Sequence, residues 1–120
     1  MSIDITCYTS VNIDELKEKL DEVRVKYDHL FDGPYLMFEP HIILNHQQLE
    51  LIDYRVEKYN QETKLLIAEE FGLKEPNSYF FFFFNDKSFP ELNTSEIADV
   101  IRLELGEENV IVLLNGEDLI

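Results

Sequence analysis

The chain has 120 residues and a net charge of −15, from 25 acidic and 10 basic side chains. That length suits a single domain over residues 1–120, and the 45% hydrophobic fraction supplies a core without disulfides or metal ions. A negative charge of this size repels nucleic acid and anionic membrane surfaces, so the composition excludes both as partners. It favours instead the binding of a basic protein.

Cys7 is the only cysteine, so the chain cannot form an intramolecular disulfide, as is usual in a reducing cytoplasm. The N-terminal residues lack the basic and apolar regions of a signal peptide, and no apolar run reaches the roughly 20 residues that span a membrane. We therefore expect a cytoplasmic protein. No basic residue or histidine neighbours Cys7, which predicts a small core side chain rather than a reactive thiol.

Two strongly apolar segments organise the fold. Tyr79–Phe84 contains six aromatic residues without a polar one in alternation, and Val110–Leu114 is also apolar throughout. Successive side chains of a strand point to opposite faces, so both strands need cover on both faces. The interval between them has room for one helix. The simplest prediction is a βαβ unit with parallel strands and a right-handed crossover.

The first part of the chain predicts a strand, a helix and a bent strand. Ile3–Thr9 alternates apolar and polar residues, which indicates a half-buried strand nearer the sheet edge. Asn12 is a helix cap, followed by apolar residues at 3- and 4-residue spacing as far as Leu30, and a stop at residues 32–34. Extended segments at 35–38 and 41–44 flank Pro40, which predicts an edge strand or a bend.

Residues 46–73 are mostly helical in pattern. Leu49, Ile52, Val56 and Tyr59 follow 3, 4, 3 spacing and predict a face turned to the core, with a break near residues 60–61. The alternation of Ile52, Tyr54 and Val56 leaves a strand within 46–60 as the alternative.

A last helix is predicted from Asn93 to Leu105, and Asn115-Gly116 is a turn before a short tail. The helix has a buried stripe of Ile97, Val100, Ile101 and Leu105. The fold class is therefore α/β or α+β. It has about four strands in a mixed sheet, a C-terminal βαβ unit and three to four helices.

No catalytic, cofactor or metal motif is present. His29, His41 and His46 lack the spacing of a zinc site, and each of the four glycines lies where an element ends. Asn85 and Asp86 follow a buried strand, where α/β folds place ligand sites, and are the only candidates for catalysis. We expect a protein without enzymatic activity, cofactor or metal.

Residues 91–120 contain eight acids and only Arg102 as a base. The helix and the turn after it can present a group of carboxylates from one side, with Phe89 or Tyr8 as apolar anchors. The predicted partner-binding residues are Glu96, Asp99, Glu104, Glu107 and Glu108. The alternative interpretation is a solvated acidic surface that keeps a small protein soluble.

Small size, a strongly acidic balance and the lack of a catalytic motif make the chain resemble bacterial immunity proteins that neutralise polymorphic toxins, such as those of contact-dependent growth inhibition systems. The resemblance concerns the whole chain and no shared motif. It implies a basic toxin as the partner, in many cases a nuclease, neutralised by stoichiometric electrostatic and steric occlusion. Two alternatives remain open. One is an adaptor or regulatory subunit in a homo-oligomer, and the other is a small ligand-binding domain or enzyme with a site near Asp86.

Overall fold

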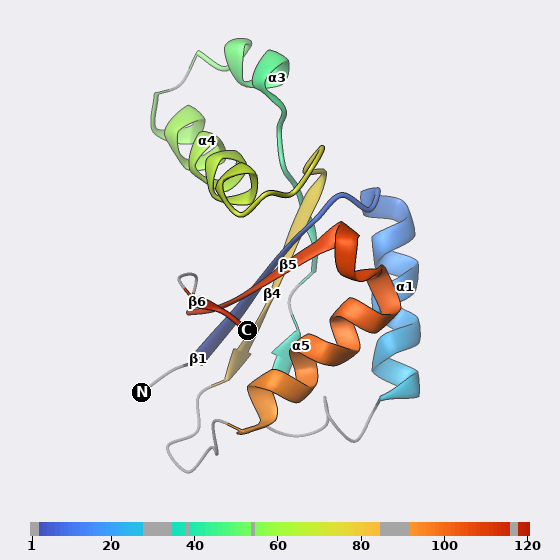
Figure 1. The fold of residues 1–120 in the computed structure, drawn as a ribbon. Helices are drawn as coiled ribbons and strands as arrows, with labels where there is room; N and C mark the ends of the chain where they lie inside the picture. The colour runs from blue at the N-terminus through green and yellow to red at the C-terminus, as the bar shows by residue number, and fades with distance from the viewer. Residues whose placement is uncertain (1–2, 28–34, 38, 54, 85–91, 116–117) are drawn as a thin grey trace.

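One antiparallel sheet with helices on both faces forms the centre of the molecule (Figure 1). The computed structural model describes residues 3–27, 35–37, 39–53, 55–84, 92–115 and 118–120. In chain order the elements are β1 (Ile3–Thr9), α1 (Ile13–Lys26), β2 (Tyr35–Met37), β3 (His41–Ile42), α3 (His46–Glu50), α4 (Arg55–Glu70), β4 (Ser78–Phe84), α5 (Leu92–Leu105), the 3-10 turn η1 (Glu107–Asn109), β5 (Val110–Leu114) and β6 (Asp118–Leu119). The mixed α/β class is confirmed.

The strand order is β2-β4-β1-β5-β6, with β3 also paired to β4. β1 is antiparallel to both β4 and β5, so these two run in the same direction and α5 connects them, as predicted. β1 lies between them, so the two strands do not pair directly and the βαβ unit is split. All pairings among the described strands are antiparallel, whereas we expected a mixed sheet.

The prediction that β1 lies nearer a sheet edge than β4 is wrong, because β1 is the central strand. Its alternating pattern reflects incomplete cover on one face of the sheet. Ile5 and Cys7 are buried on the covered face, whereas Asp4 and Thr6 are only partly buried on the other. A central strand can therefore alternate where one of its faces stays partly open.

β2 and β3 form the edge beyond β4. β2 pairs with residues 82–84 and β3 with residues 78–79, so both extended segments follow the same neighbouring strand. Pro40 lies between them, and the edge position that it predicted is confirmed.

α1 and α5 cover one face of the sheet (Figure 1). Phe80 and Phe82 are fully buried there, with an edge-to-face ring contact at 5.7 Å between centroids. They pack with Leu16 of α1 and with the predicted stripe of α5, including Ile97 and Ile101. This face confirms the predicted burial of the aromatic strand and of the last helix.

α3 and α4 cover one end of the opposite face (Figure 1). Leu65 and Ala68 of α4 pack there with Ile111 and Leu113 of β5. Tyr8 belongs to the same cluster and is only 2% exposed, so it cannot serve as the exposed anchor that we predicted. The aromatic side chains of β4 on this face, at positions 79, 81 and 83, remain partly exposed. The expected cover on both faces is therefore complete on one side and partial on the other.

The segment 46–60 is helical, and its strand alternative is wrong. Asn45 caps α3 in a capping box, accepting from the Gln48 amide at 2.8 Å. The break lies between the end of α3 at Glu50 and the start of α4 at Arg55, rather than at 60–61. Leu49 and Ile52 therefore lie before α4. They do not share a helix face with Val56 and Tyr59, although the sequence spacing suggested one. Val56 and Tyr59 are consequently exposed rather than turned to the core.

The two ends of the chain add smaller corrections. The predicted cap Asn12 is confirmed, because its side chain accepts from the Asp14 amide at 2.9 Å. The predicted continuation of this helix to Leu30, and its stop, lie outside the described residues. The C-terminal tail forms the short strand β6 on β5, which its two residues were too few to reveal. Among the described residues, no helix is both long and apolar enough to cross a membrane.

Burial of Cys7 yields a test of the core. The thiol is fully buried, and this burial raises its pKa well above the ordinary value. The reactive thiolate therefore forms only when the core opens. We expect a thiol reagent to label the native chain at least about a thousandfold more slowly than the urea-unfolded chain. Labelling at comparable rates would show that β1 does not occupy the centre of the sheet.

Glu104 joins α5 to α1 and yields a second test. Its carboxylate accepts from Lys26 Nζ at 3.0 Å and from the Tyr27 hydroxyl at 2.8 Å. The bond from Lys26, followed by that from Tyr27, lowers the pKa of Glu104. A lowered folded-state pKa stabilises the fold above the unfolded value of about 4.3, and this contribution is lost as the pH falls through the folded-state pKa.

We expect Glu104→Gln to lower the free energy of unfolding at pH 7, and the difference from the unmodified chain to shrink below about pH 4. Urea unfolding across this range measures it. Exposed Glu96 on the same helix has no partner in the described part of the chain, so Glu96→Gln is the matched control. A constant difference across the pH range would contradict the role of the Glu104 charge.

Candidate functional site

The carboxylates predicted to bind a partner fall into two groups. Glu96 and Asp99 are exposed on α5, and Glu107 and Glu108 are exposed on η1, which directly follows that helix. Glu104 is less exposed than these, because it turns toward α1 and its oxygen is used by Lys26 and Tyr27. Glu104 therefore has a structural task, whereas the other four carboxylates are accessible.

Gly106 places the two carboxylates of η1. Its φ of +93° is a conformation that glycine adopts easily, and a Cβ there would lie 2.8 Å from Asn109 Nδ2. The Asn109 side chain also donates to the Leu105 carbonyl at 3.1 Å, which fastens the turn to the end of α5. The direction of Glu107 and Glu108 is thus fixed by a tight turn.

Leu103 lies among these acids and is 74% exposed. Together with Asp99, Arg102, Gly106 and Glu107 it lines a shallow hollow at the end of α5. A large apolar side chain surrounded by charged groups is the usual arrangement of a protein interface, in which an apolar anchor has a polar rim. We call Glu96, Asp99, Leu103, Glu107 and Glu108 the α5–η1 surface.

The position of Glu107 and Glu108 is unfavourable for α5, because both directly follow its C-terminal end. The C-terminal end of a helix carries partial negative charge, so cations are stabilising there and each carboxylate costs about 0.3–1 kcal/mol. Arg102 is the only base in the last turn, and its nearest carboxylate is Asp99 at 3.5 Å. Glu107 and Glu108 have no ion-pair partner among the described residues. Fold stability therefore does not explain why acids gather here.

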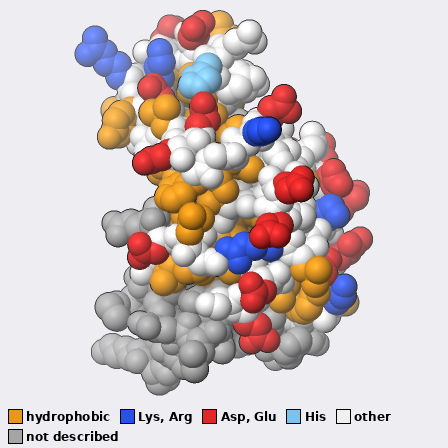
Figure 2. Space-filling view, in the orientation of Figure 1, with side chains coloured by type: hydrophobic (Ala, Val, Ile, Leu, Met, Phe, Trp, Pro, Cys, Tyr) orange, Lys and Arg blue, Asp and Glu red, His pale blue; other side chains and the backbone are white. Residues whose placement is uncertain are grey.

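Acidic side chains also occur elsewhere on the visible face of the molecule, so charge alone does not define a site (Figure 2). Apolar side chains gather where the α3–α4 part meets the rest of the molecule (Figure 2). The α5–η1 surface combines an exposed leucine with accessible carboxylates.

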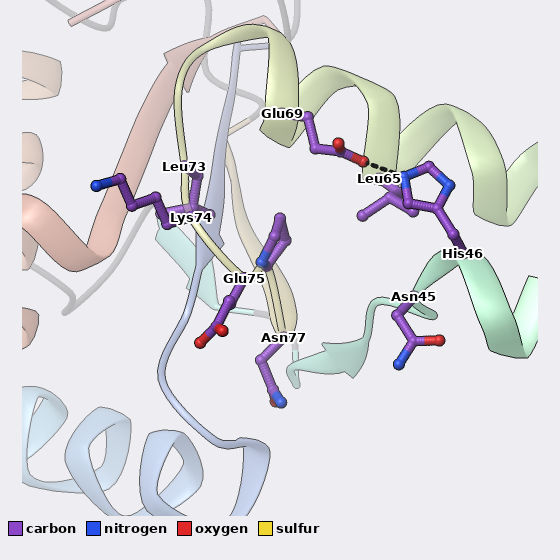
Figure 3. A pocket seen from close by; sticks show the side chains of 9 residues that line it. Asn45, His46, Leu65, Glu69, Leu73, Lys74, Glu75 and Asn77 are labelled. Atoms are coloured by element: carbon purple, nitrogen blue, oxygen red, sulfur yellow. Dashed lines mark hydrogen bonds and ion pairs between the residues drawn. The ribbon is translucent and has the colours of Figure 1, made fainter.

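A larger hollow lies between α3, α4 and the loop before β4 (Figure 3). Its volume is about 950 Å³, and Leu65, Leu73 and Pro76 form its apolar lining. His46 points to Glu69, with 2.7 Å between Nε2 and Oε1. The side chains of its other polar residues point away from this pair (Figure 3).

The hollow offers little for catalysis. The side chains of His46 and Glu69 are both solvent-exposed, at 64% and 42%, and none of the described residues that line the hollow is a serine, threonine or cysteine. His41 is exposed in β3, 5.5 Å from the Tyr79 ring, and does not line it. In the described ranges, no group of three or more His, Cys, Asp or Glu side chains is arranged to hold a metal ion. The predicted catalytic candidates Asn85 and Asp86, the anchor Phe89 and His29 lie outside the described residues.

Sequence reasoning missed Leu103. It falls between the predicted buried positions 101 and 105 of the last helix, and no exposed apolar side chain is predicted there from the sequence. The signal that could have identified Leu103 as exposed is its position on the helix, away from the buried stripe of Ile97, Ile101 and Leu105.

Comparison with known proteins clarifies the identity of the chain. No curated protein matches the sequence. A solved structure titled "CdiA-CT/CdiI toxin and immunity complex from Burkholderia pseudomallei" contains a chain with a similar fold, at a TM-score of 0.70 and 20% sequence identity. The match covers 98% of this chain and 95% of that one. The family model described as "CDI System Immunity Component" matches residues 1–118. Because this match covers nearly every residue, the chain belongs to the family of immunity components of contact-dependent growth inhibition systems.

Proposed function

We propose that this immunity protein neutralises its toxin by binding it stoichiometrically through the α5–η1 surface, and that the toxin is a basic nuclease domain. The observation that carries the proposal is the exposed Leu103 among four accessible carboxylates, in a chain with a net charge of −15. The protein acts as an inhibitor without catalysis, in the cytoplasm of the bacterium that carries it.

Electrostatics supports a basic partner. A nuclease needs Lys and Arg side chains where it holds the phosphates of its substrate. Carboxylates on the immunity protein are complementary to such a groove, and a strongly negative chain accelerates the encounter. The carboxylates on η1 have no partner within the described chain, so a basic partner gains their attraction without breaking existing ion pairs.

Leu103 supplies the apolar contact that charges alone do not provide. Exposed ion pairs contribute little to affinity, because water and salt screen them. A leucine that becomes buried against the toxin contributes about 1.5–3 kcal/mol. In the proposed complex, Leu103 contributes affinity, and the carboxylates around it increase the association rate and orient the partner. The bulk of the bound protein then excludes the nucleic acid substrate.

Glu107→Lys/Glu108→Lys is expected to weaken binding of the toxin domain encoded beside this chain by roughly 10- to 100-fold at low salt. The loss should shrink at high salt, because screening removes the attraction that the change abolishes. Titration calorimetry at two salt concentrations measures both effects. Glu50→Lys/Glu57→Lys on α3 and α4 changes the net charge equally and is the matched control. Equal losses for both double variants would mean that only overall charge matters.

Leu103→Ala is expected to weaken the same complex by at least about tenfold at any salt concentration, because the lost contact is apolar. Val25→Ala on α1 truncates a side chain of similar exposure, 80%, and should leave affinity unchanged. The thermal midpoint of both variants should stay near that of the unmodified chain. If Leu103→Ala binds normally, the toxin occupies another surface.

Nuclease neutralisation has its own assay. The toxin domain should degrade RNA or DNA, and one equivalent of this chain should abolish the cleavage. A toxin that forms the complex but cleaves neither nucleic acid would overturn the nuclease part while leaving the interface intact.

A further inference from the structure

α4 carries an exposed stripe on the side away from the core. Arg55, Tyr59, Thr63, Leu66 and Glu70 follow each other at spacings of 4, 4, 3 and 4, which places them on one narrow face of the helix. Tyr59 is 71% exposed and Leu66 is 49% exposed. The core side of α4 is formed by Leu65 and Ala68, which are buried against the sheet. We call these five residues the α4 stripe.

The α4 stripe is complementary to itself. Arg55 lies at its N-terminal end and Glu70 at its C-terminal end. The large apolar side chains Tyr59 and Leu66 lie between them, two helical turns apart. When a second α4 lies antiparallel across it, Arg55 of each copy faces Glu70 of the other, and Tyr59 faces Leu66. A two-fold axis near Thr63 generates both sets of contacts, as in an isologous dimer, where residue i meets j and j meets i.

The remaining groups of the stripe permit such contact. The Thr63 hydroxyl already donates to the Tyr59 carbonyl at 2.8 Å, so covering it leaves no unmet donor. Neither Arg55 nor Glu70 has an ion-pair partner in the described part of the chain, so both charges are available. Exposed Val56 flanks Tyr59 and extends the apolar contact.

We infer that the α4 stripe is a self-association surface, on which a second copy of this chain packs antiparallel to form a two-fold dimer. One helix face is small compared with the interfaces of permanent dimers, so the association is weak and depends on concentration. α5, which carries Leu103, packs on the opposite face of the sheet from α4, so the dimer leaves this helix accessible (Figure 1). The inference is therefore independent of the proposed function.

Salt distinguishes this association from toxin binding. Two copies of charge −15 repel each other, and the two exposed Arg–Glu pairs contribute little against this. Screening therefore strengthens the dimer as salt rises, whereas it weakens binding to a basic toxin.

A charge exchange tests the inference with the full chain. Sedimentation velocity from roughly 10 µM to 1 mM protein should show a monomer–dimer equilibrium that shifts to dimer at higher salt. Arg55→Glu and Glu70→Arg should each weaken it by about tenfold, because each places like charges opposite one another. An equimolar mixture of the two variants restores both pairs, as does the double variant, and both should dimerise within about threefold of the unmodified chain.

Tyr59→Ser should abolish the dimer, whereas Val25→Ser, on an equally exposed site of α1, should not. All substituted positions are exposed, and thermal midpoints close to that of the unmodified chain confirm that the variants are folded. A monomer at every concentration and salt would overturn the inference. So would a dimer that survives Tyr59→Ser, or single charge variants that the mixture does not rescue.

Discussion

The pairing of β1 with both β4 and β5 is the constraint on which the rest of the structure depends. These are the longest pairings in the sheet, and they join the first residues of the chain to its last third. They align the buried side chains of three strands on one face, where Ile5, Phe82 and Val112 pack with α1 and α5. On the other face they align Tyr8, Ile111 and Leu113 for α4. Both hydrophobic clusters therefore require the same central strand.

This arrangement also separates the charges from the core. The helices present one apolar side to the sheet, and no charged side chain among the described residues is buried. A net charge of −15 opposes compaction through self-repulsion, and an apolar layer buried on both faces of the sheet stabilises the fold against it. The acids at the end of α5 add to this cost, because they lie at the negative end of a helix dipole. Their presence is better explained by a contact outside the chain than by folding.

The sequence allowed prediction of those features that depend on local pattern. The apolar run Tyr79–Phe84, the cap Asn12 and the strand interruption at Pro40 each have a local physical cause, and each was predicted correctly. The position of β1 depends on pairing with residues about 70 and 100 positions away, which no local pattern specifies. The orientation of α4 was unpredictable for a similar reason. Because α3 ends before Ile52 and α4 begins after it, Ile52 and Val56 do not share one helix face, and the side of α4 that packs on the sheet carries Leu65 and Ala68 instead.

The candidate site shows the same division between composition and position. Composition identified the acidic C-terminal quarter, because eight acids against one base are visible in the sequence. It could not distinguish Glu104, which bonds to α1, from Glu107 and Glu108, which face solvent. That distinction requires knowing that Lys26 and Tyr27, almost 80 residues earlier, lie beside α5. A carboxylate that already has a cation is a poor contact for a second one, because binding must first break the existing pair. In the complex proposed above, the favoured contacts are therefore the acids that the fold leaves without partners among the described residues, such as Glu107 beside Leu103.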